Sequence, residues 1–182
     1  MNLALMLLHP HQPHWQTDFL RIQALLLDAL DGHGASVLHV GSTAVPGLAA
    51  KPILDIDIVF PAEVTLQQVE ARLAGLGYAH MGDQGITERE VFKRLPAQAH
   101  PVLDTIAHHL YACPTHSREL ARHVTFRDHL IAHPEARQGY EDLKQEIALL
   151  VGQDRKRYAA LKETMAKAFI EDILNKAIPM VP

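Results

Sequence analysis

Cysteine, positive charge and long apolar runs are all scarce in this chain of 182 residues. Its one cysteine, Cys113, cannot form an intramolecular disulfide, which favours a cytoplasmic protein. No apolar stretch approaches the roughly 20 residues that a membrane-spanning helix needs, so no membrane interaction is expected. The net charge of −4 argues against broad electrostatic binding to nucleic acid. A small local phosphate site is compatible with this charge.

Histidine, in contrast, is abundant, with 13 residues. His9, His11 and His14 lie close together, but the prolines between them match no helical or zinc-finger ligand spacing. We interpret them as a solvated cluster, and whether it binds a metal stays open. Residues 1–8 are apolar but lack a positively charged segment, so we expect an arm that packs on the core and not an export signal.

The length suits a single domain with a sizeable core. Hydrophobic periodicity and turn residues predict α/β (α+β) organisation over about residues 13–113, followed by a helical extension over about 114–178. Asp104 and its apolar neighbours fall within one of the expected strands, and residues 79–90 are expected to form a loop. The expected helices are 15–30, 65–73, 116–131, 134–151 and 153–177, and the expected strands are 37–40, 53–60, 91–95 and 102–113.

The clearest chemical signal is the turn Gly41-Ser42-Thr43 followed by Asp55 and Asp57. Glycine after a buried strand allows backbone N–H groups to approach an anion, and the two hydroxyls add donors. Residues two apart on a strand share a face, so the aspartates form a carboxylate pair. Such a pair, together with substrate phosphates, is typical of a site for Mg²⁺ (or Mn²⁺).

A simpler interpretation is that Gly-Ser-Thr is an ordinary turn and that both aspartates lie on a solvated strand face. The apolar residues on both sides of Asp55 and Asp57 argue against it, because they indicate a central strand, where an unpaired carboxylate is costly.

The segment from His39 to Ile56 resembles the hallmark of the GrpB family, and its Gly-Ser and Asp-x-Asp parts resemble the DNA polymerase β-like nucleotidyltransferase superfamily. This resemblance covers about residues 13–177. It implies a nucleotidyltransferase-like mixed sheet flanked by helices. The family also occurs fused to dephospho-CoA kinase in some bacteria. Further likeness lies at 13–15, 76–78, 109–111 and 126–130.

Active members of the superfamily usually carry a third carboxylate on a later strand. Here that region offers Asp104, His108 and His109, with no aspartate at the matching position. His109 is expected either as a metal ligand or base or as a hydrogen-bonded structural residue. Tyr111 replaces the second histidine of the family's His-Leu-His strand, which weakens the case for an essential histidine pair.

Cationic residues are expected to complete the site. Lys51 is expected either to neutralise phosphate charge, which its place in the family motif favours, or to be a surface lysine in a loop. Arg127 is expected either to reach a phosphate or to have a structural role, and it is not expected to face Asp128, its neighbour on a helix. Lys144 and Lys162 are interpreted as lysines that line a cleft or that are simply solvated.

These features predict a metal-dependent nucleotidyltransferase that uses a nucleoside triphosphate and an unknown small-molecule or protein acceptor. Gly41, Ser42, Thr43, Lys51 and Arg127 would bind the nucleotide, and Asp55, Asp57 and His109 would be catalytic. Two alternatives remain: a non-catalytic module that binds nucleotides or CoA precursors, and a partner-binding protein that keeps the site only as structure. The donor base and the oligomeric state stay open.

Overall fold

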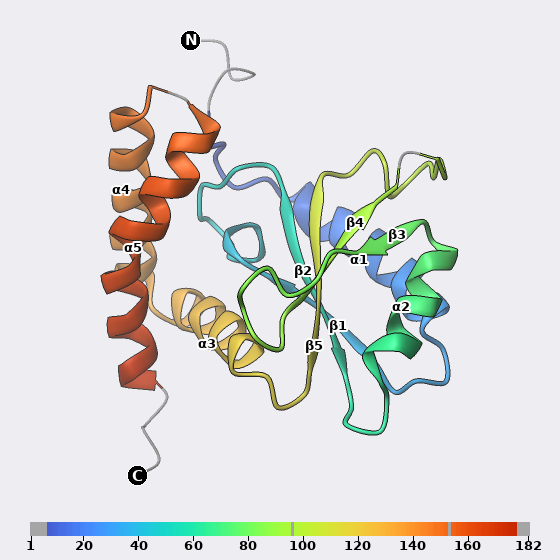
Figure 1. The fold of residues 1–182 in the computed structure, drawn as a ribbon. Helices are drawn as coiled ribbons and strands as arrows, with labels where there is room; N and C mark the ends of the chain where they lie inside the picture. Colours follow the sequence, from blue (N-terminus) through green and yellow to red (C-terminus); the bar gives the residue numbers. More distant parts are fainter. Residues whose placement is uncertain (1–6, 96, 153, 178–182) are drawn as a thin grey trace.

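The computed structural model describes residues 7–95, 97–152 and 154–177. Within these residues a five-stranded mixed sheet, in the order β1-β2-β5-β4-β3, has helices on both faces (Figure 1). The elements are α1 (His14–Ala29), β1 (Ser36–Val40), the short 3-10 helix η2 (Ser42–Ala44), β2 (Leu54–Phe60), α2 (Leu66–Gly75), β3 (Tyr78–His80), β4 (Glu90–Arg94), β5 (His108–Pro114), α3 (Arg118–Ala132), α4 (Pro134–Leu150) and α5 (Arg155–Ala177).

Strand β2 organises the sheet, because it pairs antiparallel with β1 and parallel with β5. Its residues alternate between the two faces. Leu54, Ile56 and Ile58 point to one face and are almost completely buried. Asp55 and Asp57 therefore share the opposite face, as the sequence predicts.

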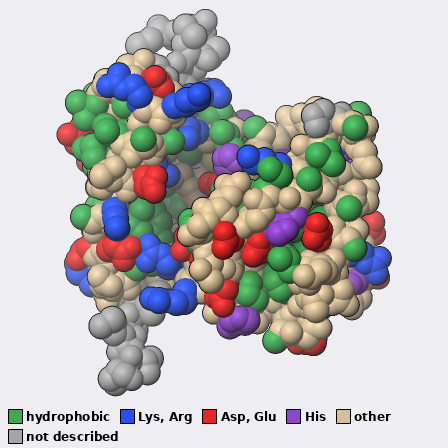
Figure 2. Space-filling model, in the orientation of Figure 1, with side chains coloured by type: hydrophobic (Ala, Val, Ile, Leu, Met, Phe, Trp, Pro, Cys, Tyr) green, Lys and Arg blue, Asp and Glu red, His purple; other side chains and the backbone are tan. Residues whose placement is uncertain are grey.

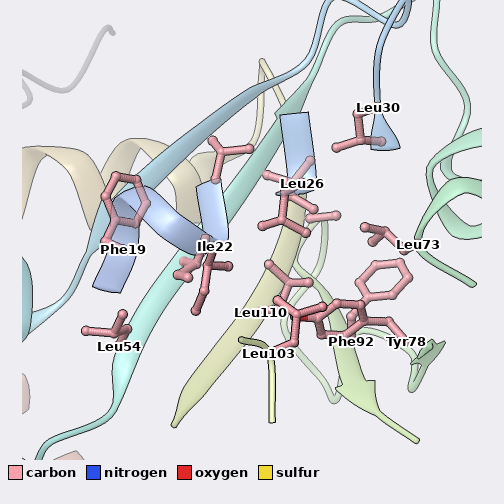
Figure 3. Close-up of a cluster of buried hydrophobic side chains, with 14 of the residues drawn as sticks. Phe19, Ile22, Leu26, Leu30, Leu54, Leu73, Tyr78, Phe92, Leu103 and Leu110 are labelled. Carbon is pink, nitrogen blue, oxygen red and sulfur yellow. The ribbon is translucent and has the colours of Figure 1, made fainter. Parts of the chain in front are cut away.

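The apolar face of β2 and β5 is covered by α1 and α2 (Figure 1). Figure 3 shows Phe19, Ile22 and Leu26 of α1 packed over the strands that carry Leu54 and Leu110. Complete burial of an Ile or Leu side chain contributes about 1.5–3 kcal/mol, so this cluster anchors β2 in its register.

The other face is covered by α3, and α4 and α5 lie outside it (Figure 1). Leu120 of α3 packs against Val59 and Cys113 of the sheet. A separate cluster joins the three helices to the segment after β1, and it includes Val45, Leu48, Leu130, Tyr140, Ala166 and Ile173. The two aspartates of β2 thus lie between the sheet and the helical extension.

The mixed α/β architecture is confirmed, with differences in detail. The strand expected at 102–113 begins only at His108, because Val102 and its neighbours form a turn in which Thr105 and Ile106 both donate backbone N–H groups to Val102. Strand β3 lies partly in the segment expected to be a loop. The helices start and end within about two residues of their expected bounds.

The described part of the N-terminal segment packs on the extension. Residues 1–6 of the expected arm lie outside the described residues. Leu7 and Leu8 are buried against α4 and α5, and the backbone of His9 exchanges two hydrogen bonds with Ala50. Cys113 is fully buried, and burial raises the pKa of its thiol to about 12, consistent with a packed, inert side chain. No helix among the described residues is long and apolar enough to span a membrane.

Candidate functional site

The turn after β1 brings Gly41 against Asp55. Gly41 has φ +72° and ψ −170°, a conformation that favours glycine. A Cβ atom there would lie 2.3 Å from Asp55 Oδ2. Glycine is therefore required both by the backbone and by the carboxylate, and it places Ser42 beside Asp55.

A buried histidine fixes the rest of this turn. His39 stacks on Phe19 with 4.8 Å between ring centroids, and its Nε2 lies 2.9 Å from Thr43 Oγ1. Burial, reinforced by the nearby Arg127, lowers the pKa of His39 to about 4. His39 is therefore neutral at physiological pH and holds the Thr43 hydroxyl in place.

Asp57 is completely buried and is paired with a residue of α3. His123 Nδ1 lies 2.8 Å from Asp57 Oδ2, and His123 Nε2 lies 3.3 Å from Glu119 Oε1. Burial alone would lower the pKa of His123, but the two carboxylates outweigh it and raise this pKa to about 9. A protonated His123 thus neutralises Asp57 at neutral pH. The other oxygen of Asp57, Oδ1, is buried without a hydrogen-bond partner.

Three lysines converge beside Asp55. They line a hollow of about 150 Å³, here called the lysine hollow. Lys144 is 1% exposed, donates to the Ala49 carbonyl and lies 3.4 Å from Ser42 Oγ. Burial, and then repulsion from Lys162, lowers the pKa of Lys144 to about 7. The polar residues that line this hollow are Ser42, Thr43, Lys51, Asp55, His109, Lys144, Tyr158 and Lys162.

A second hollow of about 270 Å³, here called the apolar hollow, also borders Asp55. Figure 2 shows the molecule hollowed between the helical extension and the sheet. The apolar wall comprises Val45, Phe126, Leu130, Ile170 and Leu174, and the polar rim includes Ser42, Asp55, Glu119, Arg122, His123, Arg127 and Lys162. Asp55 therefore lies at the junction of a cationic hollow and an apolar one, and burial raises the pKa of its carboxyl group.

The residues suit a metal that takes part of its coordination from a substrate. No group of three or more His, Cys, Asp and Glu side chains within the described ranges is arranged to hold a metal. In the described part of the chain no third carboxylate completes a metal site with the pair. His109 and Tyr111 lie opposite Asp55 and Asp57 in the register, and Asp104 is bound to Arg94 at 2.9 Å. Two carboxylates with one unpaired oxygen match Mg²⁺, which commonly uses one or two carboxylates plus phosphates and water.

Most of the site residues predicted from the sequence lie together around the lysine hollow and the apolar hollow. Gly41, Ser42, Thr43, Lys51, Asp55 and His109 border the two hollows, with Asp57 beneath them. Arg127 lies on the rim of the apolar hollow. The expectation that it does not face Asp128 is wrong, because Arg127 Nε lies 2.7 Å from Asp128 Oδ1, and its Nη1 donates to the His39 carbonyl at 2.8 Å.

Two residues of the site, Glu119 and His123, were not anticipated from the sequence. They are four apart on α3, directly after the N-cap Ser117, and this spacing places them on one helix face. That spacing is the only sequence signal for them, and it is also common on solvated helices.

The sequence profile described as "GrpB protein" matches residues 6–176. The chain belongs to the GrpB family. A UPF0157 protein of Pseudomonas aeruginosa is 34% identical over 170 residues, which are 93% of this chain and 66% of that protein, so the chain spans about two thirds of that relative.

Solved structures agree with the family and the fold. The crystal structure of GrpB from Enterococcus faecalis superimposes with a TM-score of 0.75 at 26% identity, over 93% of this chain and 98% of that one. A variant of the Cid1 poly(U) polymerase bound to MgATP is similar with a TM-score of 0.50 at 11% identity, over 75% of this chain and 45% of that one. The second likeness shows a nucleotidyltransferase-like fold alone.

Gly41→Ala should destabilise the GrpB chain more than Gly32→Ala. Both glycines have positive φ, but a Cβ at Gly32 meets nothing within 4 Å. We expect a loss of about 1–2 kcal/mol in the free energy of unfolding at Gly32 and at least about 3 kcal/mol at Gly41, measured by urea unfolding. Equal losses would show that the Asp55 carboxylate moves away from the new methyl group without cost.

The stabilisation from His123 should disappear at high pH. Because its folded pKa of about 9 lies above the ordinary value of 6.5, the contribution is complete below pH 6.5 and is lost as the pH rises through 9. The difference in unfolding free energy between wild type and His123→Gln should shrink by on the order of 3 kcal/mol from about pH 6 to about pH 10.

Lys144 also titrates in this pH range, but it is present in both proteins, so its effect cancels in the difference between wild type and His123→Gln. His14→Gln, at an exposed position, is the matched control and should show a constant difference. A constant difference for His123→Gln as well would mean that His123 is neutral beside Asp57.

Proposed function

We propose that this GrpB protein is a metal-dependent nucleotidyltransferase. The observation that carries the proposal is that Lys51, Lys144 and Lys162 line one hollow with Ser42 and Asp55. With Lys144 protonated, three lysines would face one carboxylate with an excess of positive charge, which a polyanion such as a triphosphate would balance. The nucleotidyltransferase-like fold supports the same reaction class.

The triphosphate would occupy the lysine hollow. Ser42 and the turn at Gly41 would donate hydrogen bonds to its terminal phosphates, with Lys144 on one side. The Thr43 hydroxyl is already bonded to His39, so its role is to shape the turn. Arg127 is similarly engaged with Asp128 and the His39 carbonyl, which favours a structural role over phosphate binding.

Asp55 and the unpaired oxygen of Asp57 would hold Mg²⁺ or Mn²⁺. When bound, the ion would withdraw charge from the phosphate oxygens in the transition state. His123 already occupies the second oxygen of Asp57, so this residue offers one oxygen without rearrangement.

In the proposed step, the acceptor's hydroxyl or amine attacks the α-phosphorus. The new bond to phosphorus forms as the bond between the α-phosphorus and the oxygen bridging to the β-phosphate breaks, and pyrophosphate leaves with that electron pair. The proton of the acceptor passes to the imidazole of His109, which is exposed and lies opposite Asp55 in the register. His109 would thus act as the general base.

A second candidate is a binding module for nucleotides or CoA precursors. The lack of a third carboxylate beside Asp55 and Asp57 among the described residues favours it, because two carboxylates are sufficient for binding a metal–nucleotide complex. The two functions share the lysine hollow and differ only in turnover.

Mg²⁺-dependent triphosphate binding should be lost in Asp55→Asn/Asp57→Asn. Calorimetric titration of the four nucleoside triphosphates, dephospho-CoA and CoA, with and without Mg²⁺, should identify a triphosphate whose affinity for wild type rises with the metal. In the double variant the affinity should no longer respond to Mg²⁺, because the carboxylates that hold the ion are gone.

Asp28→Asn, at an exposed position on α1, should behave as wild type. Triphosphate binding that ignores Mg²⁺ in wild type would contradict the metal site. Binding of dephospho-CoA without any triphosphate would favour the second candidate.

Lys144→Gln should weaken triphosphate binding roughly tenfold or more, the value of one charge-assisted hydrogen bond. Lys167→Gln, on the exposed side of α5, should leave the affinity unchanged. Because the folded pKa of Lys144 is about 7, the bound anion should raise it, and wild type should take up a proton on binding near pH 8. Calorimetry in buffers of different ionisation enthalpy measures this uptake, and its persistence in Lys144→Gln would refute the assignment.

A further inference from the structure

Strands β4 and β5 separate next to the site and enclose a third hollow. They pair from Glu90 to Phe92, whereas Lys93 and Arg94 pair only with β3. The space left beside β5 has a volume of about 500 Å³ and is here called the β4–β5 hollow. It is lined by the basic side chains of Arg89, Lys93 and Arg94 in and just before β4, and by His108 and His109 of β5.

The β4–β5 hollow adjoins the two hollows already described. His109 lines both this hollow and the lysine hollow, and Tyr111 lines both this hollow and the apolar hollow. These two residues lie opposite Asp55 and Asp57 in the register of β2 and β5. A molecule in the β4–β5 hollow would therefore reach the carboxylate pair past His109 and Tyr111.

Arg89 contributes to this hollow a buried donor that has no hydrogen-bond partner among the described residues. Its guanidinium lies 4.8 Å from the centroid of the Tyr111 ring, and its Nε is buried without a hydrogen-bond partner. The neighbouring Arg94 differs, because it bonds to Asp104 at 2.9 Å and to the Leu76 and Gln98 carbonyls. A buried donor left unpaired is costly, so Arg89 favours an arrangement in which a ligand accepts its hydrogen bond.

The loop that carries Arg89 is held in place. The backbone N–H of Arg89 donates to the Ile86 carbonyl at 3.2 Å. Glu88 Oε1 lies 3.3 Å from Nε2 of His116, in the segment before α3. Gln84 and Glu88 both have positive φ, 51° and 61°, which L side chains adopt at a cost of about 1–2 kcal/mol. The loop therefore adopts a backbone conformation that is unfavourable at two residues, and in this conformation Arg89 lies over Tyr111.

We propose that the β4–β5 hollow is the acceptor site and that Arg89 binds an oxyanion group of the acceptor, a phosphate monoester or a carboxylate. The planar guanidinium matches both groups, and stacking on Tyr111 orients it. The acceptor's nucleophile then lies beyond His109, beside the lysine hollow. This assignment rests on the proposed nucleotidyl transfer and adds the chemical class of its second substrate.

Tungstate, an oxyanion located by its anomalous scattering, tests the site in crystals of the full chain. We expect tungsten beside Arg89 in wild type and in Lys93→Gln, whose side chain is exposed in the same hollow, and loss of this tungsten in Arg89→Gln. Absence of tungsten beside Arg89 in wild type would overturn the proposal. Tungsten that persists in Arg89→Gln would be an adventitious ion only and would overturn it too.

Competing soaks distinguish the two oxyanions. If only glycerol 3-phosphate displaces tungstate, the acceptor group is a phosphate monoester, and if only glycerate does, it is a carboxylate. If each of them displaces tungstate, the site binds both kinds of oxyanion, as proposed. Equal displacement by uncharged glycerol, or no displacement by any of the three, would count against an oxyanion subsite.

Binding of tungstate at Arg89 and binding of the triphosphate in the lysine hollow can be measured independently. Arg89→Gln should bind the Mg²⁺–triphosphate complex with the affinity of wild type, because Arg89 does not line the lysine hollow. Triphosphate binding without tungstate at Arg89 refutes the acceptor site alone. Tungstate at Arg89 in a chain that binds no triphosphate refutes the transfer reaction and, with it, the acceptor role.

Discussion

The placement of two carboxylates, one fully buried and one half-buried, on one face of the central strand is the constraint on which the rest of the structure depends. Asp57 has no exposed surface, and burial raises the pKa of Asp55. An isolated carboxylate in such surroundings is expensive, so the fold must supply cations close by. They come from beyond the sheet: His123 from α3, Lys144 from α4 and Lys162 from α5. The helical extension is therefore part of the site, because without it Asp57 would lose its His123 partner and Asp55 would keep only Lys51 of the three lysines.

The compensation is unequal on the two aspartates. Asp57 is matched by one protonated histidine at hydrogen-bond distance, which leaves a single oxygen unpaired. Around Asp55 the lysines outnumber the carboxylates, and their mutual repulsion contributes to the low pKa of Lys144. One aspartate thus has a charged partner at hydrogen-bond distance, and the other lies in a hollow lined by lysines. This asymmetry directs an anionic ligand to the side of Asp55.

Short sequence patterns predicted the parts of the site that are formed by residues close together in the chain. The alternation of β2 placed both aspartates on one face, and the glycine after β1 marked the turn that touches Asp55. The pairing of Asp57 with His123 spans 66 positions, and the position of a helix face against the sheet is set only when the helix docks. The error at residues 102–107 has a similar cause, since Leu103 and Ile106 are buried in the core from a turn and apolar composition alone does not distinguish a turn from a strand.

Tyr111 connects the carboxylate strand to Arg89, because it lies opposite Asp57 in the register and its ring lies against the Arg89 guanidinium. Burial raises the pKa of the Tyr111 phenol to about 12, so the side chain is neutral and offers Arg89 no ion pair. The ring supports the guanidinium and leaves its buried Nε without a hydrogen-bond partner. In the proposed reaction Arg89 is therefore available to recognise the acceptor, while His109 accepts the proton.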